Sequence, residues 1–240
     1  MGDFIFNGVS AGFMGLRVER IPRQHSPRKN ITTYDIPGGQ PLTHWDGTWA
    51  NFQQSYECWF KSPLVGRQAR RIKEWLHAAP ANSRLEDTYD DEVYHLATYA
   101  GGGDIENILE RYGRFVVTFD CNARAYLKSA DVVRPITGTD LINNPSPFPA
   151  KPLIEVTGSV SGLLTIGDRN ITIRFPGMET QTMRIDCELQ EAWDITDGGE
   201  ESRNDWITWS EPPVLRPGAT VVKITGGIES AKIWTRSYVV

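Results

Sequence analysis

Residues 144–158 read NPSPFPAKPLIEVTG, a proline-rich segment followed by a strand-like one. Four prolines stand between 145 and 152, and the alternation typical of a strand then begins at Leu153. Proline removes a ladder donor and restrains the residue before it, so the five prolines between 128 and 152 predict an extended, semi-rigid connector. We therefore expect two domains, residues 1–134 and 135–240, with the proline-rich connector at about 128–152 between their main bodies.

The chain before the prolines has the pattern of strands with one helix. Residues 114–121 alternate, with Phe115, Val117, Phe119 and Cys121 on one face, as in a half-buried strand. Ser62-Pro63 is a helix start, and Pro80 ends the periodic segment that follows. Its apolar stripe consists of Val65, Ala69, Ile72 and Leu76. We expect a helix over about 63–79, packed on a sheet.

The chain after the prolines predicts a second β domain. Short alternating segments recur around residues 171–175, 185–189, 221–224 and 233–238, with turn residues between them. Twenty-two glycines and fifteen prolines, with few long helix-forming runs, fit many turns. The fold class expected is mainly β: an α+β N-terminal part, which is a β-sandwich with one helix, and a C-terminal β-sandwich or jelly roll.

Charge and cysteine content restrict the function classes. The formal net charge is −5, so the chain has no general positive field for nucleic acid. Three cysteines more than sixty residues apart indicate neither a metal knuckle nor a disulfide framework. We expect assembly in a reducing cytoplasm, with no export leader and no membrane segment. One basic cluster stands out and could be a solvated loop or a subunit contact: Arg17, Arg20, Arg23, Arg28 and Lys29.

No motif for catalysis, cofactor or metal binding is present in the sequence. Gly101-Gly102-Gly103 lacks the residues of a phosphate loop, and the four histidines lack metal-site spacing. The carboxylates at 90–92 and 200–201 keep a glycan hydrolase open as an alternative, since such enzymes need paired acids. Trp206 and Trp209 are weak candidates for carbohydrate contact, and they would face opposite ways on a strand. A carbohydrate-binding module for host adhesion is the main alternative function.

Five segments in order resemble the distal tail protein (Dit) family of bacteriophages with long, non-contractile tails. They are DFIFNGVSAGFMGLRVERIPRQHSPRKNITTYDIPGG at 3–39, RRIKEWLHAA at 70–79, GRFVVTFDCNARAY at 113–126, PLIEVTG at 152–158 and LRPGATVVKITGG at 215–227. The likeness spans most of the chain and rests on the order and spacing of these segments.

The resemblance implies a structural hub without enzymatic activity, located in the virion tail. It implies an N-terminal domain that forms a homohexameric ring and a C-terminal galectin-like sandwich. The implied partners are the major tail tube protein, a tail-tip lysin-like protein, the tape measure and a receptor-binding protein. DNA would pass through the ring without specific binding. Sugar binding is not implied, because no histidine of a galectin sugar site follows His95.

Overall fold

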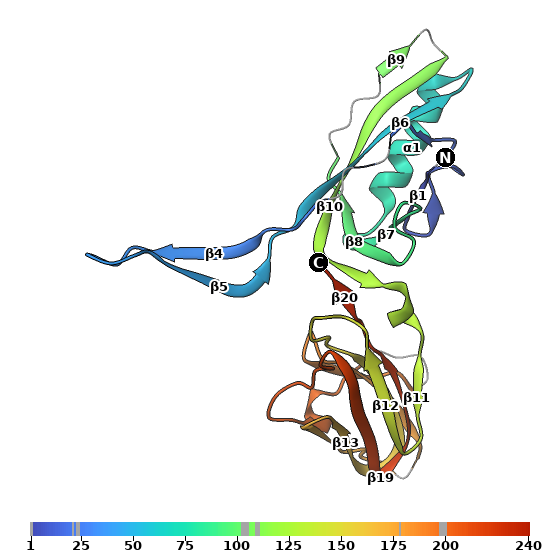
Figure 1. Cartoon of the computed structure of the whole chain (residues 1–240). Coiled ribbons are helices and arrows are strands. Elements are labelled where there is room, and N and C mark those ends of the chain that lie inside the picture. The colour runs from blue at the N-terminus through green and yellow to red at the C-terminus, as the bar shows by residue number, and fades with distance from the viewer. Residues whose placement is uncertain are drawn as a thin grey trace. The chain divides into compact units, whose positions relative to one another are not determined.

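The structure is a computed structural model that describes residues 2–20, 22, 25–101, 106–108, 111–177, 179–196 and 201–240, with the backbone alone for 106–108. Its contacts divide the chain into two compact units, unit 1 (residues 1–125 with 240) and unit 2 (126–239). Figure 1 shows that strands dominate both units. The described residues contain one α-helix, so the prediction of a mainly β chain with a helix in its N-terminal part is confirmed.

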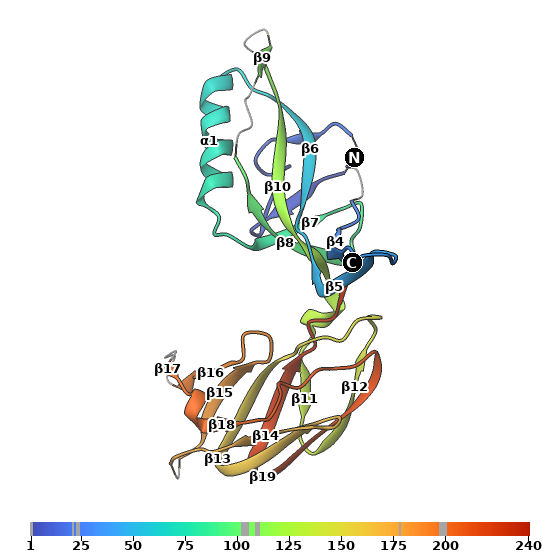
Figure 2. The same ribbon diagram turned by 90° about the vertical axis from the view of Figure 1, so that its left-hand side faces the viewer.

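Unit 1 is a sheet with a helix on one face (Figure 2). The strands run in the order β2-β1-β7-β8-β10-β6-β3, and β9 also pairs with β10. The elements of this sheet and its helix are β1 (Phe4–Phe6), β2 (Val9–Ser10), β3 (Arg17–Val18), β6 (Phe52–Lys61), α1 (Val65–Ala78), β7 (Ser83–Asp87), β8 (Val93–Tyr99), β9 (Glu106–Ile108) and β10 (Tyr112–Leu127).

The helix α1 packs through the stripe that the sequence predicted. Val65, Ile72 and Leu76 are buried, and Ala69 packs against the same core. The helix begins at Val65, two residues after the proline, because the Ser62 hydroxyl accepts a hydrogen bond from the Leu64 amide at 3.1 Å and turns the chain before the first helical residue. No described helix has the length and apolar character that crossing a membrane requires.

The core of unit 1 is aromatic and is organised around Phe119 on β10. Phe119 has no solvent exposure, and its ring centroid lies 4.7 Å from that of Phe6 and 5.6 Å from that of Phe4. Phe115, Val117 and Cys121 share its buried face, as the alternation predicted, while Val116 on the opposite face is 46% exposed. The buried face of β10 therefore contributes more to the stability of unit 1 than the exposed face does.

Unit 2 is one curled sheet whose main path is β11-β19-β13-β15-β16-β17. Strand β12 also pairs with β19, and β14 links β13 to β18. The elements of unit 2 are η1 (Lys128–Asp131), β11 (Arg134–Ile136), β12 (Thr139–Asn144), β13 (Leu153–Ile166), β14 (Arg169–Ile173), β15 (Gln181–Asp186), β16 (Glu191–Asp194), β17 (Glu201–Ser202), η3 (Asn204–Trp206), β18 (Ile207–Thr208), β19 (Gly218–Trp234) and β20 (Tyr238–Val239), the last of which is not a strand of this sheet.

The curl of unit 2 is made where β13 and β19 change register. The pairing shifts between Thr157 and Gly162, and Gly226 adopts a φ of +73°. A Cβ atom on Gly226 would lie 2.9 Å from the backbone of Ser161, so only glycine fits. Residues on both sides of the shift, such as Val156 and Leu164, enter one core. The sheet thereby folds over itself and encloses a sandwich-like interior.

The proline-rich segment 128–152 is not a connector, contrary to our expectation. Strand β12 pairs with the first part of β19, and β11 pairs with its last part. The single proline of these strands, Pro135, lies on an edge strand, where a missing donor is tolerated. Unit 2 begins at residue 126 and not at 135, because these strands complete its sheet.

Two buried polar residues, Asn144 and Ser146, fix the proline turns of this segment. The Asn144 side chain is 1% exposed and donates 2.9 Å hydrogen bonds to the carbonyls of Phe148 and Leu215. Its own oxygen accepts from the Ser146 amide at 3.1 Å. Ala150 then exchanges two backbone hydrogen bonds with Leu215. Prolines leave few donors, and these side chains satisfy the carbonyls that remain.

We expect Phe119→Ala to lower the free energy of unfolding by about 3–5 kcal/mol, because it leaves a cavity among aromatic rings. Val116→Ala, on the exposed face of the same strand, should change it by less than about 1 kcal/mol. Urea denaturation of the intact protein, with hydrogen exchange to assign the unit 1 transition, measures both. Equal effects of the two substitutions would contradict the assignment of the core face.

Candidate functional site

The most unusual surface of unit 1 is a hairpin formed by β4 (Lys29–Tyr34) and β5 (Leu42–Trp49). The two strands pair with each other and with no other strand in the described part of the chain. Figure 1 shows them as a ribbon that extends beyond the sheet. Every residue of β4 is exposed, and so is all of β5 except its last residue. An isolated two-stranded ribbon is at best marginally stable in water, so contact with a further surface would stabilise this one.

The hairpin carries apolar side chains on both faces. Ile31 lies opposite Trp45, and Tyr34 lies opposite Leu42 on the other face, because the two pairs are separated by an odd number of positions. Ile31, Tyr34 and Leu42 are 55% to 59% exposed. Large apolar groups gathered on an extended segment mark an interaction surface. A partner would have to cover both faces to remove them from water.

The base of the hairpin is held by a cation and two tryptophans. The Lys29 ammonium lies 4.4 Å from the ring centroid of Trp45 and 5.4 Å from that of Trp49. The Trp45 indole donates a 2.7 Å hydrogen bond to the Thr48 carbonyl. Asp46 accepts from the Thr48 amide and hydroxyl, and these bonds lower the pKa of its carboxyl. The sequence analysis missed this cluster, although the spacing of two tryptophans in one strand was a visible signal.

The basic residues that the sequence grouped are placed in two different settings. Arg17 and Arg20 belong to the β3 edge of the sheet, where the Arg17 guanidinium lies 6.0 Å from the Trp59 ring and Arg20 lies 3.8 Å from the Glu57 carboxylate. Arg28 is exposed just before β4, and Lys29 is bound at the hairpin base. Arg23 lies outside the described residues. Their role at an oligomer interface stays a prediction.

The two candidate sugar contacts both pack toward the interior of unit 2. Trp206 ends the short helix η3 and Trp209 follows β18, so they do not alternate along one strand as we expected. Both are partly buried against the unit 2 core. The Arg203 guanidinium lies 4.9 Å from the Trp206 ring and covers part of it. Sugar stacking by these rings stays a prediction.

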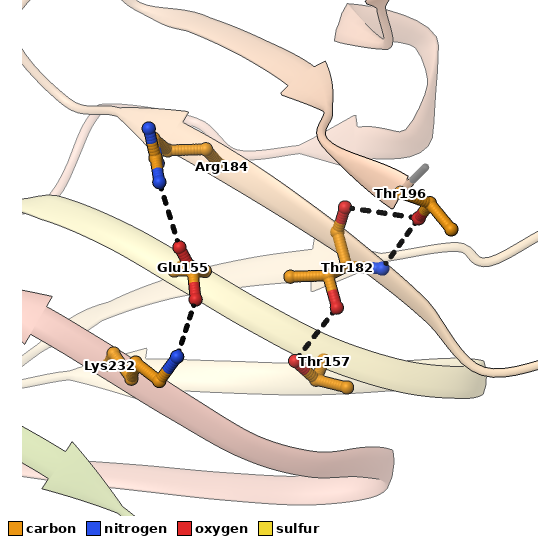
Figure 3. A network of polar contacts seen from close by, with 6 residues as sticks. All are labelled: Glu155, Thr157, Thr182, Arg184, Thr196 and Lys232. Carbon is orange, nitrogen blue, oxygen red and sulfur yellow. Dashed lines mark hydrogen bonds and ion pairs between the residues drawn. The ribbon is translucent and has the colours of Figure 1, made fainter. Parts of the chain in front are cut away.

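A polar network crosses three strands on the outer face of the unit 2 sheet (Figure 3). Glu155 of β13 accepts a 2.9 Å hydrogen bond from Arg184 of β15 and a 2.8 Å bond from Lys232 of β19. Beside it, the hydroxyls of Thr157 and Thr182 lie 3.1 Å apart. Burial alone would raise the pKa of Glu155, but the two cationic donors outweigh it and lower the pKa. The network ties the strands together across the face.

Three kinds of side chain bear on catalysis: metal ligands, carboxylates and cysteines. No three His, Cys, Asp or Glu side chains gather as a metal site within the described ranges. The carboxylates of Asp90, Asp91 and Glu92 lie exposed in the turn after β7, and Glu200 lies outside the described residues. The three free cysteines are buried, and burial raises the pKa of each thiol to about 12. None is a thiolate nucleophile at neutral pH.

The similarity of this chain to known proteins is found in its structure and not in its sequence. No protein-family model and no curated protein matches the chain. Among solved structures, the SPP1 Dit protein, described as a paradigm of the hub adsorption apparatus in phages that infect Gram-positive bacteria, matches over 97% of both chains with a TM-score of 0.68 and 12% identity. The fold is that of a Dit protein.

A second solved structure supports the same assignment. A chain of the phage P2 baseplate in its activated conformation with Ca matches with a TM-score of 0.57 and 10% identity, again over 97% of each chain. The Dit fold expected from the resemblance is therefore confirmed. At these identities the likeness concerns the fold, and no individual residue role follows from it.

We expect all three cysteines of this Dit-fold chain to resist a disulfide thiol reagent in the native state. Their thiols are buried and protonated at neutral pH. Absorbance of the released chromophore should appear only when denaturant is added, and it should then account for three thiols per chain. Rapid labelling of any cysteine without denaturant would contradict its burial.

We expect Glu155→Gln to lower the free energy of unfolding by about 1–3 kcal/mol at neutral pH, because two charged hydrogen bonds are weakened. The folded pKa of Glu155 is lowered, so its stabilising contribution is present above the ordinary value of 4.5 and is lost as the pH falls through the folded value. The difference between the variant and the natural protein should shrink over that range. Denaturation curves at a series of pH values measure this, with the exposed Glu191→Gln as the control.

Proposed function

We propose that the protein is a structural hub at the distal end of a phage or prophage-derived tail. Copies of the chain form a homo-oligomeric ring, most simply a hexamer, that joins the tail tube to tail-tip and receptor-binding components. The support is twofold: the Dit fold extends over 97% of the chain, and unit 1 carries a hairpin with apolar groups on both faces. The hairpin carries the proposal because a chain that acted alone would leave it uncovered in water.

A ring explains the form of the hairpin. In a cyclic assembly each copy presents one surface to its neighbour on one side and a different surface on the other. A ribbon that extends from one copy can lie on the next, so both of its faces become buried. This arrangement requires no cofactor, metal or catalytic residue, and the proposed role is structural.

The proposed partners follow from the position of the hub in a tail. They are the major tail tube protein on one side, and a tail-tip lysin-like protein, the tape measure and a receptor-binding protein on the other. The net charge of −5 per chain fits a conduit through which DNA passes without being held. The proposed location is the virion tail, assembled in the bacterial cytoplasm.

We expect replacement of Ile31 and Leu42 by serine to weaken the assembly strongly while the thermal stability of the monomer changes little. Both side chains are more than half exposed in one chain, so their burial occurs only in the oligomer. Each contributes about 1.5–3 kcal/mol when fully buried, which corresponds to a tenfold or larger rise in the dissociation constant. Light scattering over a concentration series measures the change.

The matched control is the replacement of Thr33 and Thr43 by serine, at paired positions of the same hairpin. It removes two exposed methyl groups and should leave assembly unchanged. Negative-stain electron microscopy of the natural protein should show rings with a central hole. A monomer at every concentration tested would contradict the proposed function.

A further inference from the structure

The outer face of helix α1 is a positively charged surface that forms no ion pair with the described residues of unit 1. Arg67, Arg70, Arg71 and Lys73 are all exposed, and Glu74 is the single carboxylate of the helix. The helix cannot rotate to hide them, because Ile72 and Leu76 are buried on its other side. The Gln68 amide also donates a 2.6 Å hydrogen bond to the Met14 carbonyl and fixes the helix against the loop before β3.

The cations on this face have no partners within the described chain. No ion pair is formed by any of the four, although ion pairs occur elsewhere on unit 1, such as Arg114 with Glu19 at 2.9 Å. Arg67, Arg70 and Arg71 are neighbours on the helix surface at spacings of three and four residues, so their charges repel one another. An acidic partner would relieve this repulsion.

The same unit carries a group of exposed carboxylates in the turn between β7 and β8. Asp90, Asp91 and Glu92 are consecutive and exposed in the turn between β7 and β8, and none of the three forms an ion pair in the described part of the chain. The turn is held in place by Asp87, which accepts hydrogen bonds from the amides of Tyr89 and Asp90 at 2.9 and 3.0 Å. The three carboxylates are thus presented on a fixed loop.

We propose that the outer face of α1 in one copy docks on the 90–92 turn of the next copy. This inference rests on the proposed ring, because a head-to-tail contact needs two different complementary patches on one chain, and unit 1 has such a pair. No ion pair joins the two patches within one chain, so both are free to act between copies. The negative net charge of the chain favours this partner over a nucleic acid.

Charge reversal of each patch tests the pairing in the full-length protein. One variant carries Arg67→Glu, Arg70→Glu and Arg71→Glu, and the other carries Asp90→Lys, Asp91→Lys and Glu92→Lys. Each variant alone should lose at least about tenfold in the association constant of the oligomer, as measured by light scattering, because every contact becomes repulsive. Salt should weaken the natural oligomer, because it screens the attraction, and should favour association of each variant, because it screens the repulsion.

If the contact is between copies, mixing the two variants should restore assembly of the oligomer. An equimolar mixture should assemble with the two chains alternating, since the acidic helix of one meets the lysine turn of the other. A single chain with all six changes should assemble as well. The control carries the same charge change on unit 2, with Arg134→Glu, Arg174→Glu and Lys223→Glu, and should assemble as the natural protein does.

The outcomes separate this inference from the proposed function. Natural protein that forms rings, with both variants forming them equally well, would overturn the inference and leave the hub intact. Natural protein that never assembles would overturn the hub itself. If the helix variant assembled normally but lost binding to a DNA duplex that the natural protein binds, the partner of the helix would be nucleic acid and the inference would be wrong.

Discussion

The pairing of β13 with β19 is the interaction on which unit 2 depends. It runs from Leu153 opposite Trp234 to Ile166 opposite Val222. Strands β11 and β12 pair with β19, strands β14 and β15 pair with β13, and β16 and β18 continue the sheet outward from β15 and β14. The shift of register at the glycines bends both strands together, so one sheet supplies both layers of a core. Glu155 reinforces the pair from outside, because it binds a cation on each neighbouring strand.

Unit 1 differs from unit 2 because some of its exposed groups have no partner within the described chain. Its interior is closed by packed aromatic rings around Phe119. Among the described residues, however, its hairpin has no third strand, and the four cations on the outer face of α1 form no ion pair. A chain that leaves backbone, apolar and charged groups uncovered in separate places has several surfaces for neighbours, as expected of an assembly component.

Parts of this arrangement could be read from the sequence because they depend on local periodicity. The buried faces of α1 and β10 follow from spacings of three to four and of two residues, and the structure has the same residues inside. The proline-rich segment was misread for the same reason. The sequence shows that Pro135 lacks a backbone donor. It does not show that Pro135 lies on β11, an edge strand beside β19, where a missing donor is tolerated.

The sequence by itself determined the mainly β character of the chain and the side chains that face inward on α1 and β10. Only the tertiary structure decided that residues 128–152 complete the second sheet, that Trp206 and Trp209 pack toward a core, and that β4 and β5 find no third strand among the described residues. The physical reason is that a strand gains its hydrogen bonds from partners far away in the chain. Whether an edge, a ring or a charge is covered therefore depends on contacts that no local pattern encodes.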